Sequence, residues 1–237
     1  MFGLVVTLAV LLAAACGSAP AATTVEPSLP TGAQATTVES VLTTPGAAPA
    51  TAVEVGGEIV FRIVPDQSEA RFLIEEILGG SAKTVVGVTS AVSGEIRGAF
   101  GSPQAVAVGP IQVDLSTLAT DNAFRNRAIR DAILQTGIDA NRFAVFQPTG
   151  IEGLPAEVAL GTAYELSLSG DLTIHGVTRP VTFAAVVTPV SETRLEGTAS
   201  VSLPYSDFDI RILRLPREVA SVGDVVTLEI DFVAVAG

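Results

Sequence analysis

The side chains that could carry out chemistry in this sequence are few and far apart. Its 237 residues include one Cys, Cys16, one His, His175, and no Trp. A single Cys cannot close an intrachain disulfide bond or build a thiolate zinc site, and a single His excludes His-rich metal centres. We therefore expect no metal and no cofactor, and any catalysis that needs an imidazole would depend on His175.

His175 and the acidic pair Glu75-Glu76 are the candidate catalytic groups, and neither pattern favours an enzyme. His175 ends an expected strand and precedes Gly176, which favours a role in a turn over a role as a base. No Gly-x-Ser-x-Gly motif supplies a nucleophile. Glu75 and Glu76 are adjacent, and adjacent residues of a strand point to opposite faces of a sheet. The sequence therefore predicts a protein without a catalytic residue.

The charge balance restricts the partners that the chain can bind. It has 25 Asp and Glu against 13 Lys and Arg, a formal net charge of −12. The phosphates of a nucleic acid would repel such a protein, so we expect no nucleic-acid partner. No Lys or Arg precedes Arg62, which indicates that the first quarter of the chain differs in kind from the rest.

Residues 1–16 have the features of a signal peptide. Residues 2–15 form an uncharged apolar run, which is shorter than the ~20 residues that a membrane-spanning helix needs. The run ends in Leu-Ala-Ala-Ala-Cys-Gly, which resembles a bacterial lipobox, and cleavage before Cys16 would leave that residue N-terminal and carrying lipid. The alternative is ordinary secretory cleavage at the Ala13-x-Ala15 site. Both predict export, to a membrane anchor at the cell envelope or to the outside.

Residues 17–56 predict a tether. The segment consists largely of Ala, Thr, Pro, Ser and Val and contains no aromatic residue. Such a composition cannot bury enough apolar area to offset the entropy of the chain. We therefore expect a disordered tether over residues 17–56, followed by one folded domain over residues 57–237.

Apolar residues at every second position dominate this domain. Val226, Leu228 and Ile230, for example, alternate with polar residues, as in a strand with one buried face. At least eight such segments, separated by Gly- and Pro-containing turns, favour an all-β sandwich or an antiparallel barrel. Residues 121–136 depart from the pattern, because Ile129 and Ile133 have helical spacing, and they predict one short helix.

The interior of such a barrel has two possible states. A barrel of about eight strands is either filled by its own side chains or wide enough for one small ligand. The expected inward residues are mostly Val, Ala and Leu, and the chain has only ten Phe and two Tyr. A core of this composition could close tightly or leave space, so both states stay open.

Four separate segments resemble one known family. Residues 170–183 (GDLTIHGVTRPVTF) resemble the signature of the YceI-like family of secreted lipid-binding proteins. Residues 63–72 (IVPDQSEARF) and 86–96 (VGVTSAVSGEI) resemble its first strand and second hairpin. In residues 115–146, a strand end leads to an Arg-rich helix and then to Phe-Ala-Val-Phe. The resemblance covers roughly residues 58–232, almost the whole domain.

The resemblance implies a lipocalin-like antiparallel β-barrel, with a helix against it and a tunnel that holds an isoprenoid or another long-chain lipid. On this basis we expect non-enzymatic binding, sequestration or transport of the lipid at the cell envelope, by a monomer or alternatively a dimer. The residues expected to line or cap the tunnel are inward apolar residues of the strands and the helix: Phe72, Ile74, Ile111, Val113, Ile129, Ile133, Leu166, Leu168, Phe183, Leu228 and Ile230.

Three arginines of the expected helix are candidates for recognising the polar end of such a lipid. Arg125, Arg127 and Arg130 fall within about one and a half turns, where they could face an anionic head group. The alternative is a solvated basic face that pairs with nearby aspartates. We assign Arg127 to that face and keep Arg125 and Arg130 as candidate head-group residues, for which both roles are open.

Two other functions stay open on the sequence. A barrel filled by its own side chains would make the chain a tethered structural or interaction module. An enzyme that acts on lipids through His175 is the second alternative.

Overall fold

The computed structural model describes residues 57–212, 215, 217 and 219–237. The predicted signal peptide and tether, including Cys16, therefore lie outside the described residues. No helix in the described part of the chain is both long enough and apolar enough to cross a bilayer.

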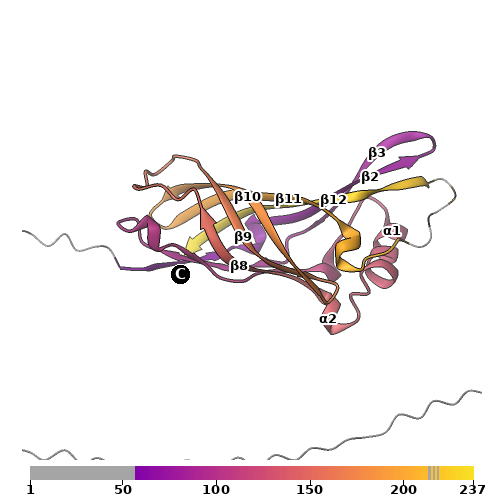
Figure 1. Cartoon of the computed structure of the whole chain (residues 1–237), viewed down its shortest axis with the longest axis horizontal. Coiled ribbons are helices and arrows are strands. Elements are labelled where there is room, and N and C mark those ends of the chain that lie inside the picture. Colours follow the sequence, from indigo (N-terminus) through magenta and orange to yellow (C-terminus); the bar gives the residue numbers. More distant parts are fainter. Residues whose placement is uncertain (1–56, 213–214, 216, 218) are drawn as a thin grey trace, which may run out of the picture. The chain divides into compact units, whose positions relative to one another are not determined.

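One antiparallel sheet of twelve strands makes up most of the described domain (Figure 1). The expectation of about eight strands corresponds to the long ones, since seven strands have nine or more residues and two, β4 and β6, have only two each. The strands are β1 (Ile59–Ile63), β2 (Glu69–Leu78), β3 (Ser81–Thr89), β4 (Val92–Ser93), β5 (Glu95–Gly98), β6 (Ala107–Val108), β7 (Ile111–Asp114), β8 (Phe143–Glu152), β9 (Tyr164–Ile174), β10 (Val177–Ser191), β11 (Arg194–Pro204) and β12 (Val219–Ala236).

The last strand, β12, organises the sheet. It has 18 residues, so it is long enough to pair with β11 along one edge and with both β2 and β1 along the other. Beyond β11, the sheet continues through the long hairpins β10–β9 and β9–β8 to β7 and β4. Segments from the two ends of the domain are thus hydrogen-bonded side by side.

The sheet curls so that its two ends approach each other. The chain leaves β3 at Thr89 and pairs three residues later, as β4, with β7 at the far end of the sheet. Val88 and Ala119 also exchange two backbone hydrogen bonds, of 2.8 and 3.0 Å between N and O. These contacts confirm the predicted all-β, barrel-like antiparallel architecture.

The expected helix is present at one end of the sheet, but it is divided. Helix α1 (Ala123–Ala128) begins after Asn122, whose side chain accepts hydrogen bonds from the backbone N–H groups of Phe124 and Arg125. The chain then continues as the π-helical turn η4 (Ile129–Ile133). A second helix, α2 (Asp139–Arg142), was not expected, because four residues are too few to show a helical period. The remaining turns are the 3-10 segments η1 (Pro65–Gln67), η2 (Pro103–Ala105), η3 (Leu115–Thr117) and η5 (Tyr205–Phe208).

Candidate functional site

A cavity of about 890 Å³ lies inside the curled sheet. It is lined by residues of the long strands β2, β9, β10, β11 and β12 and by Phe124 of α1, which lies at one end of these strands (Figure 1). Most of its wall is aliphatic or aromatic. Its volume is in the range of roughly 300–1,000 Å³ that is usual for small-molecule sites. The interior is therefore not filled by its own side chains.

A row of inward residues shows how the strands keep this space open. Leu166, Ala185, Ala199, Ile230 and Ala70 are successive cross-strand partners on β9, β10, β11, β12 and β2. All five line the cavity. Directly opposed residues of neighbouring strands share one face of a sheet, so three alanines lie where larger side chains would meet. The small methyl groups of these alanines therefore leave room for the cavity.

The structure places all eleven predicted tunnel residues on the wall of this cavity. Nine of them come from strands, and Ile129 and Ile133 come from the helical segment after α1. Phe183 packs edge to face against Phe146, with 4.9 Å between the ring centroids. Contact of these residues with a ligand stays a prediction.

The list of predicted tunnel residues omitted several aromatic residues of the wall. Phe146 and Phe232 lie on strands and share faces with Ala144 and Ile230, so alternation could have identified both. Phe100 and Phe208 lie outside the strands, in a turn and in η5. No periodic signal marks residues in such segments, and only the folded chain brings them to the cavity.

Four charged side chains meet at the end of the cavity that carries α1. Arg125 donates hydrogen bonds to Glu76 on β2, at 3.0 Å, and to Asp121, at 2.6 Å. Lys83 on β3 donates to the other oxygen of Asp121, at 2.9 Å. The hydrogen bond from Lys83 is the main cause that lowers the pKa of Asp121, and Arg125 contributes to the same shift. All four residues line the cavity.

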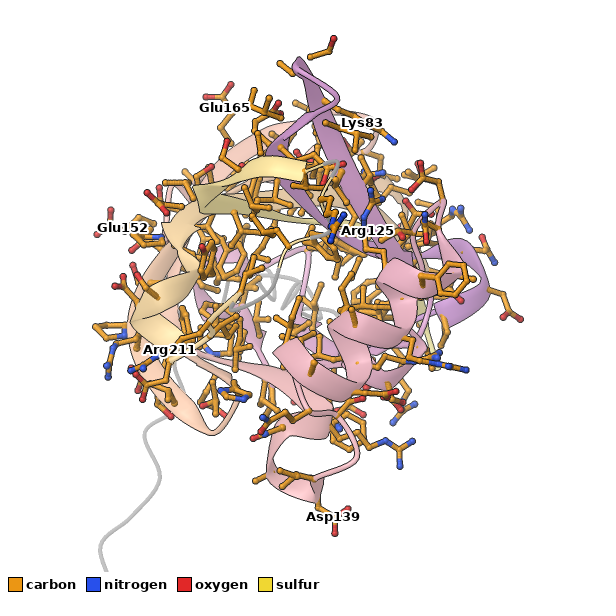
Figure 2. The ribbon with its side chains drawn as sticks, turned by 90° about the vertical axis from the view of Figure 1, so that its right-hand side faces the viewer. Lys83, Arg125, Asp139, Glu152, Glu165 and Arg211 are labelled. Carbon is orange, nitrogen blue, oxygen red and sulfur yellow. The ribbon has the colours of Figure 1, made fainter. Side chains whose placement is uncertain are left out.

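Only one of the three helix arginines lies at this cluster. Arg125 is close to the middle of the view along the sheet, whereas Asp139, Glu152 and Glu165 point outward around it (Figure 2). Arg127 is exposed and Arg130 is half-buried, and neither is among the described residues that line the cavity. The structure thus brings Arg125 to the site but not Arg130, and Arg125 also pairs with an aspartate, as the alternative interpretation expected.

His175 lies in the two-residue turn between β9 and β10, as the sequence indicated. Its φ is 53° and that of Gly176 is 73°, and Ile174 pairs with Val177 on either side of them. Both ring nitrogens are buried and, among the described residues, have no hydrogen-bond partner. The residue does not line the cavity in the part of the chain that the structure describes, so its position gives no support to a lipid-acting base.

The residues that the structure describes offer no set of metal ligands. Residues 57–212, 215, 217 and 219–237 contain no group of three or more His, Cys, Asp or Glu that could hold an ion. The cavity is lined mainly by apolar side chains and, at the end that carries α1, by the cluster of four charged residues, while Arg71, Arg97 and Glu229 also line it. Such a site can enclose a hydrocarbon chain and contact a polar group at its end.

Two solved structures have a similar fold. A polyisoprenoid-binding domain from Saccharophagus degradans aligns with a TM-score of 0.59 and 18% identity, over 76% of this chain and 99% of that one. BcnA from Burkholderia cenocepacia aligns with a TM-score of 0.55 and 16% identity, over 72% of this chain and 98% of that one. At such low identities these likenesses concern the fold.

The search of curated proteins found no match. The model of the YceI-like domain matches residues 61–234, which begin in β1 and end in β12 and so include every strand of the sheet. The chain belongs to the YceI-like domain family.

Proposed function

We propose that the domain binds a long-chain amphiphile, an isoprenoid or a lipid of similar length, inside its cavity and sequesters or carries it without a catalytic step. The observation that supports this proposal is a cavity of about 890 Å³ with a hydrocarbon wall. Moving one CH₂ group from water into such surroundings contributes ~0.8 kcal/mol. A long tail therefore supplies affinity without any specific polar contact.

The similar fold of the Saccharophagus degradans domain adds support, because that protein is described as polyisoprenoid-binding. The two chains are only 18% identical, so the class of ligand is carried over as part of this proposal. Residues of the long strands and of α1 at their end line the cavity, which suits an extended ligand better than a compact one.

The place of action belongs to the same proposal. Residues 1–16 support export, and a lipid on Cys16 would hold the domain at a membrane of the cell envelope, with residues 17–56 as the tether. Ordinary secretory cleavage would instead release the protein. We propose a monomer, because the cavity is complete within one chain, and a dimer remains the alternative.

Lipid extraction tests the proposal directly. The full chain is expressed in a bacterial host, purified without added lipid, and analysed by native mass spectrometry and by mass spectrometry of a solvent extract. We expect a bound long-chain amphiphile in a ratio of one per protein, and its removal should allow a defined isoprenoid alcohol to rebind. Repeated absence of bound lipid, together with no uptake by the delipidated protein, would favour the tethered interaction module.

A further inference from the structure

Glu76 is a carboxylate at an inward position of a strand that is otherwise apolar on that face. The inward residues of β2 are Ala70, Phe72, Ile74, Glu76 and Leu78, and all of them line the cavity. Glu76 is only 5% exposed. A buried carboxylate is strongly unfavourable unless it is paired and hydrogen-bonded. The group that pairs with Glu76 therefore determines which ligand head groups can bind at this end of the cavity.

The partner of Glu76 is Arg125, and this guanidinium is already engaged by two carboxylates. One of its nitrogens is 3.0 Å from Glu76 and another is 2.6 Å from Asp121. Asp121 in turn is bound by Lys83. These four side chains carry two positive and two negative charges, so the cluster has no net charge. Arg125 is 21% exposed, and it lies at the boundary between the apolar wall and solvent.

We infer that Glu76 makes the site selective for amphiphiles with an uncharged polar head, such as a hydroxyl or carbonyl group, over analogues that end in phosphate or carboxylate. The inference rests on the proposed function. An anionic head group that displaced Glu76 from Arg125 would leave a buried carboxylate without its partner. An anion that left the pair intact would lie close to the negative charge of Glu76. A hydroxyl group can donate to a carboxylate, and a carbonyl group can accept from the Lys83 ammonium, with the pair unbroken.

A pair of ligands with the same tail tests this inference. Geranylgeraniol and geranylgeranyl monophosphate compete with an uncharged fluorescent dye for the full-length, delipidated protein, and their dissociation constants are compared. The test variant is Glu76→Gln, which keeps the shape of the side chain and removes its charge. The matched control is Glu75→Gln. Glu75 directly precedes Glu76 on β2, is exposed, and accepts a hydrogen bond from Thr84 on the other face.

We expect the wild-type protein to bind the alcohol at least about tenfold more tightly than the phosphate, on the scale of one hydrogen bond to a charged group. Glu76→Gln should reduce or invert this ratio by a similar factor, and Glu75→Gln should leave it unchanged. The double variant Glu76→Gln/Arg125→Gln should lose the improved binding of the phosphate, because the freed guanidinium is gone. If the single variant does not fold, the ratio of the two dissociation constants of the wild-type protein still tests the inference.

Two results would overturn the inference in different ways. Equal affinities of the wild-type protein for both ligands, or a ratio that Glu76→Gln does not change, would refute the role of Glu76 and leave the proposed function intact. Failure of the wild-type protein to bind either ligand, or any copurifying lipid, would refute the proposed function and this inference together.

Discussion

Replacing Ala185 by Phe should show whether the interior of the sheet is a ligand-binding cavity or a packed core. Ala185 lies on β10 within the row of small inward residues, is 8% exposed, and lines the cavity. A phenyl group at this position would project into the space between Ala185 and the facing wall. Ala184 offers a matched control, because it precedes Ala185 on the same strand but is exposed on the outer face.

The expected loss of affinity follows from the hydrocarbon that the new ring displaces. Phe adds about six carbon atoms to Ala, and excluding four to six methylene groups of a ligand at ~0.8 kcal/mol each amounts to ~3–5 kcal/mol. This corresponds to a dissociation constant that is higher by a factor of ~10² to several thousand. In a packed core, the same substitution would cost about 1–3 kcal/mol of folding stability. In the open cavity, we expect no such loss and a gain of up to ~2 kcal/mol from burial of the ring.

The assay combines urea denaturation of the delipidated protein with titration of a long-chain isoprenoid alcohol. Ala185→Phe should weaken binding strongly and leave the free energy of unfolding the same or higher, whereas Ala184→Phe should leave binding unchanged. A variant that is less stable by more than ~1 kcal/mol but binds the alcohol as the wild-type protein does would refute the reasoning. That outcome would mean that the interior is packed around Ala185 and that lipid binds elsewhere.

Three further predictions concern the ligand tail, the acid stability and the single histidine. In a series of alcohols, each added CH₂ should lower the dissociation constant about fourfold, from ~0.8 kcal/mol per group, until the cavity is full; a flat series would contradict enclosure of the tail. The hydrogen bonds from Arg142 are the main cause that lowers the pKa of Asp114 below its ordinary value of 3.8, so the stabilisation they provide is complete above that value and is lost as the pH falls through the lowered pKa. Arg142→Gln should therefore be less stable than the wild-type protein at pH ~7 by urea denaturation, and the difference should shrink below pH ~3.8; a difference that is independent of pH would contradict this. Asn suits a turn with two positive φ angles, so His175→Asn should leave lipid uptake unchanged and unfold at the same or higher urea concentration. Loss of uptake, or of any lipid turnover, would instead support the alternative of an enzyme that acts on lipids through His175.

Alternation along the strands made the fold and much of the wall predictable. The inward faces of β2, of β9 and of β12 from Val226 onward follow a period of two, so Phe72, Leu166 and Leu228 could be placed on the wall from the sequence. The strands β4 and β6 have two residues each and helix α2 has four, which is too short for any period to appear. The open state of the interior was not predictable either, because it depends on how alanines of different strands fall into one row.

The charged cluster could be predicted only in part. Alternation correctly placed Glu75 and Glu76 on opposite faces, since Glu75 is exposed and Glu76 is buried. The partner of Glu76 is 49 residues away in the sequence, and no spacing rule links a strand residue to a helix at that separation. The π-helical turn after α1 also changes the angular positions of the residues that follow. The sequence could not distinguish Arg125 from Arg130 for this reason.

The apolar wall of the cavity and the charged cluster should contribute independently to the affinity for a ligand. Ala70, in the row of small residues, and Glu76 are six positions apart on β2, which is ~20 Å at ~3.3 Å per strand residue. Substitutions at sites separated by more than about 10 Å usually add to within ~0.5 kcal/mol. In the double variant Ala185→Phe/Glu76→Gln, the change in binding free energy of geranylgeranyl monophosphate should therefore equal the sum of the two single changes. A coupling between the two substitutions well above ~0.5 kcal/mol would mean that the head group reaches the row of alanines. The tail would then not run along the cavity from its charged end.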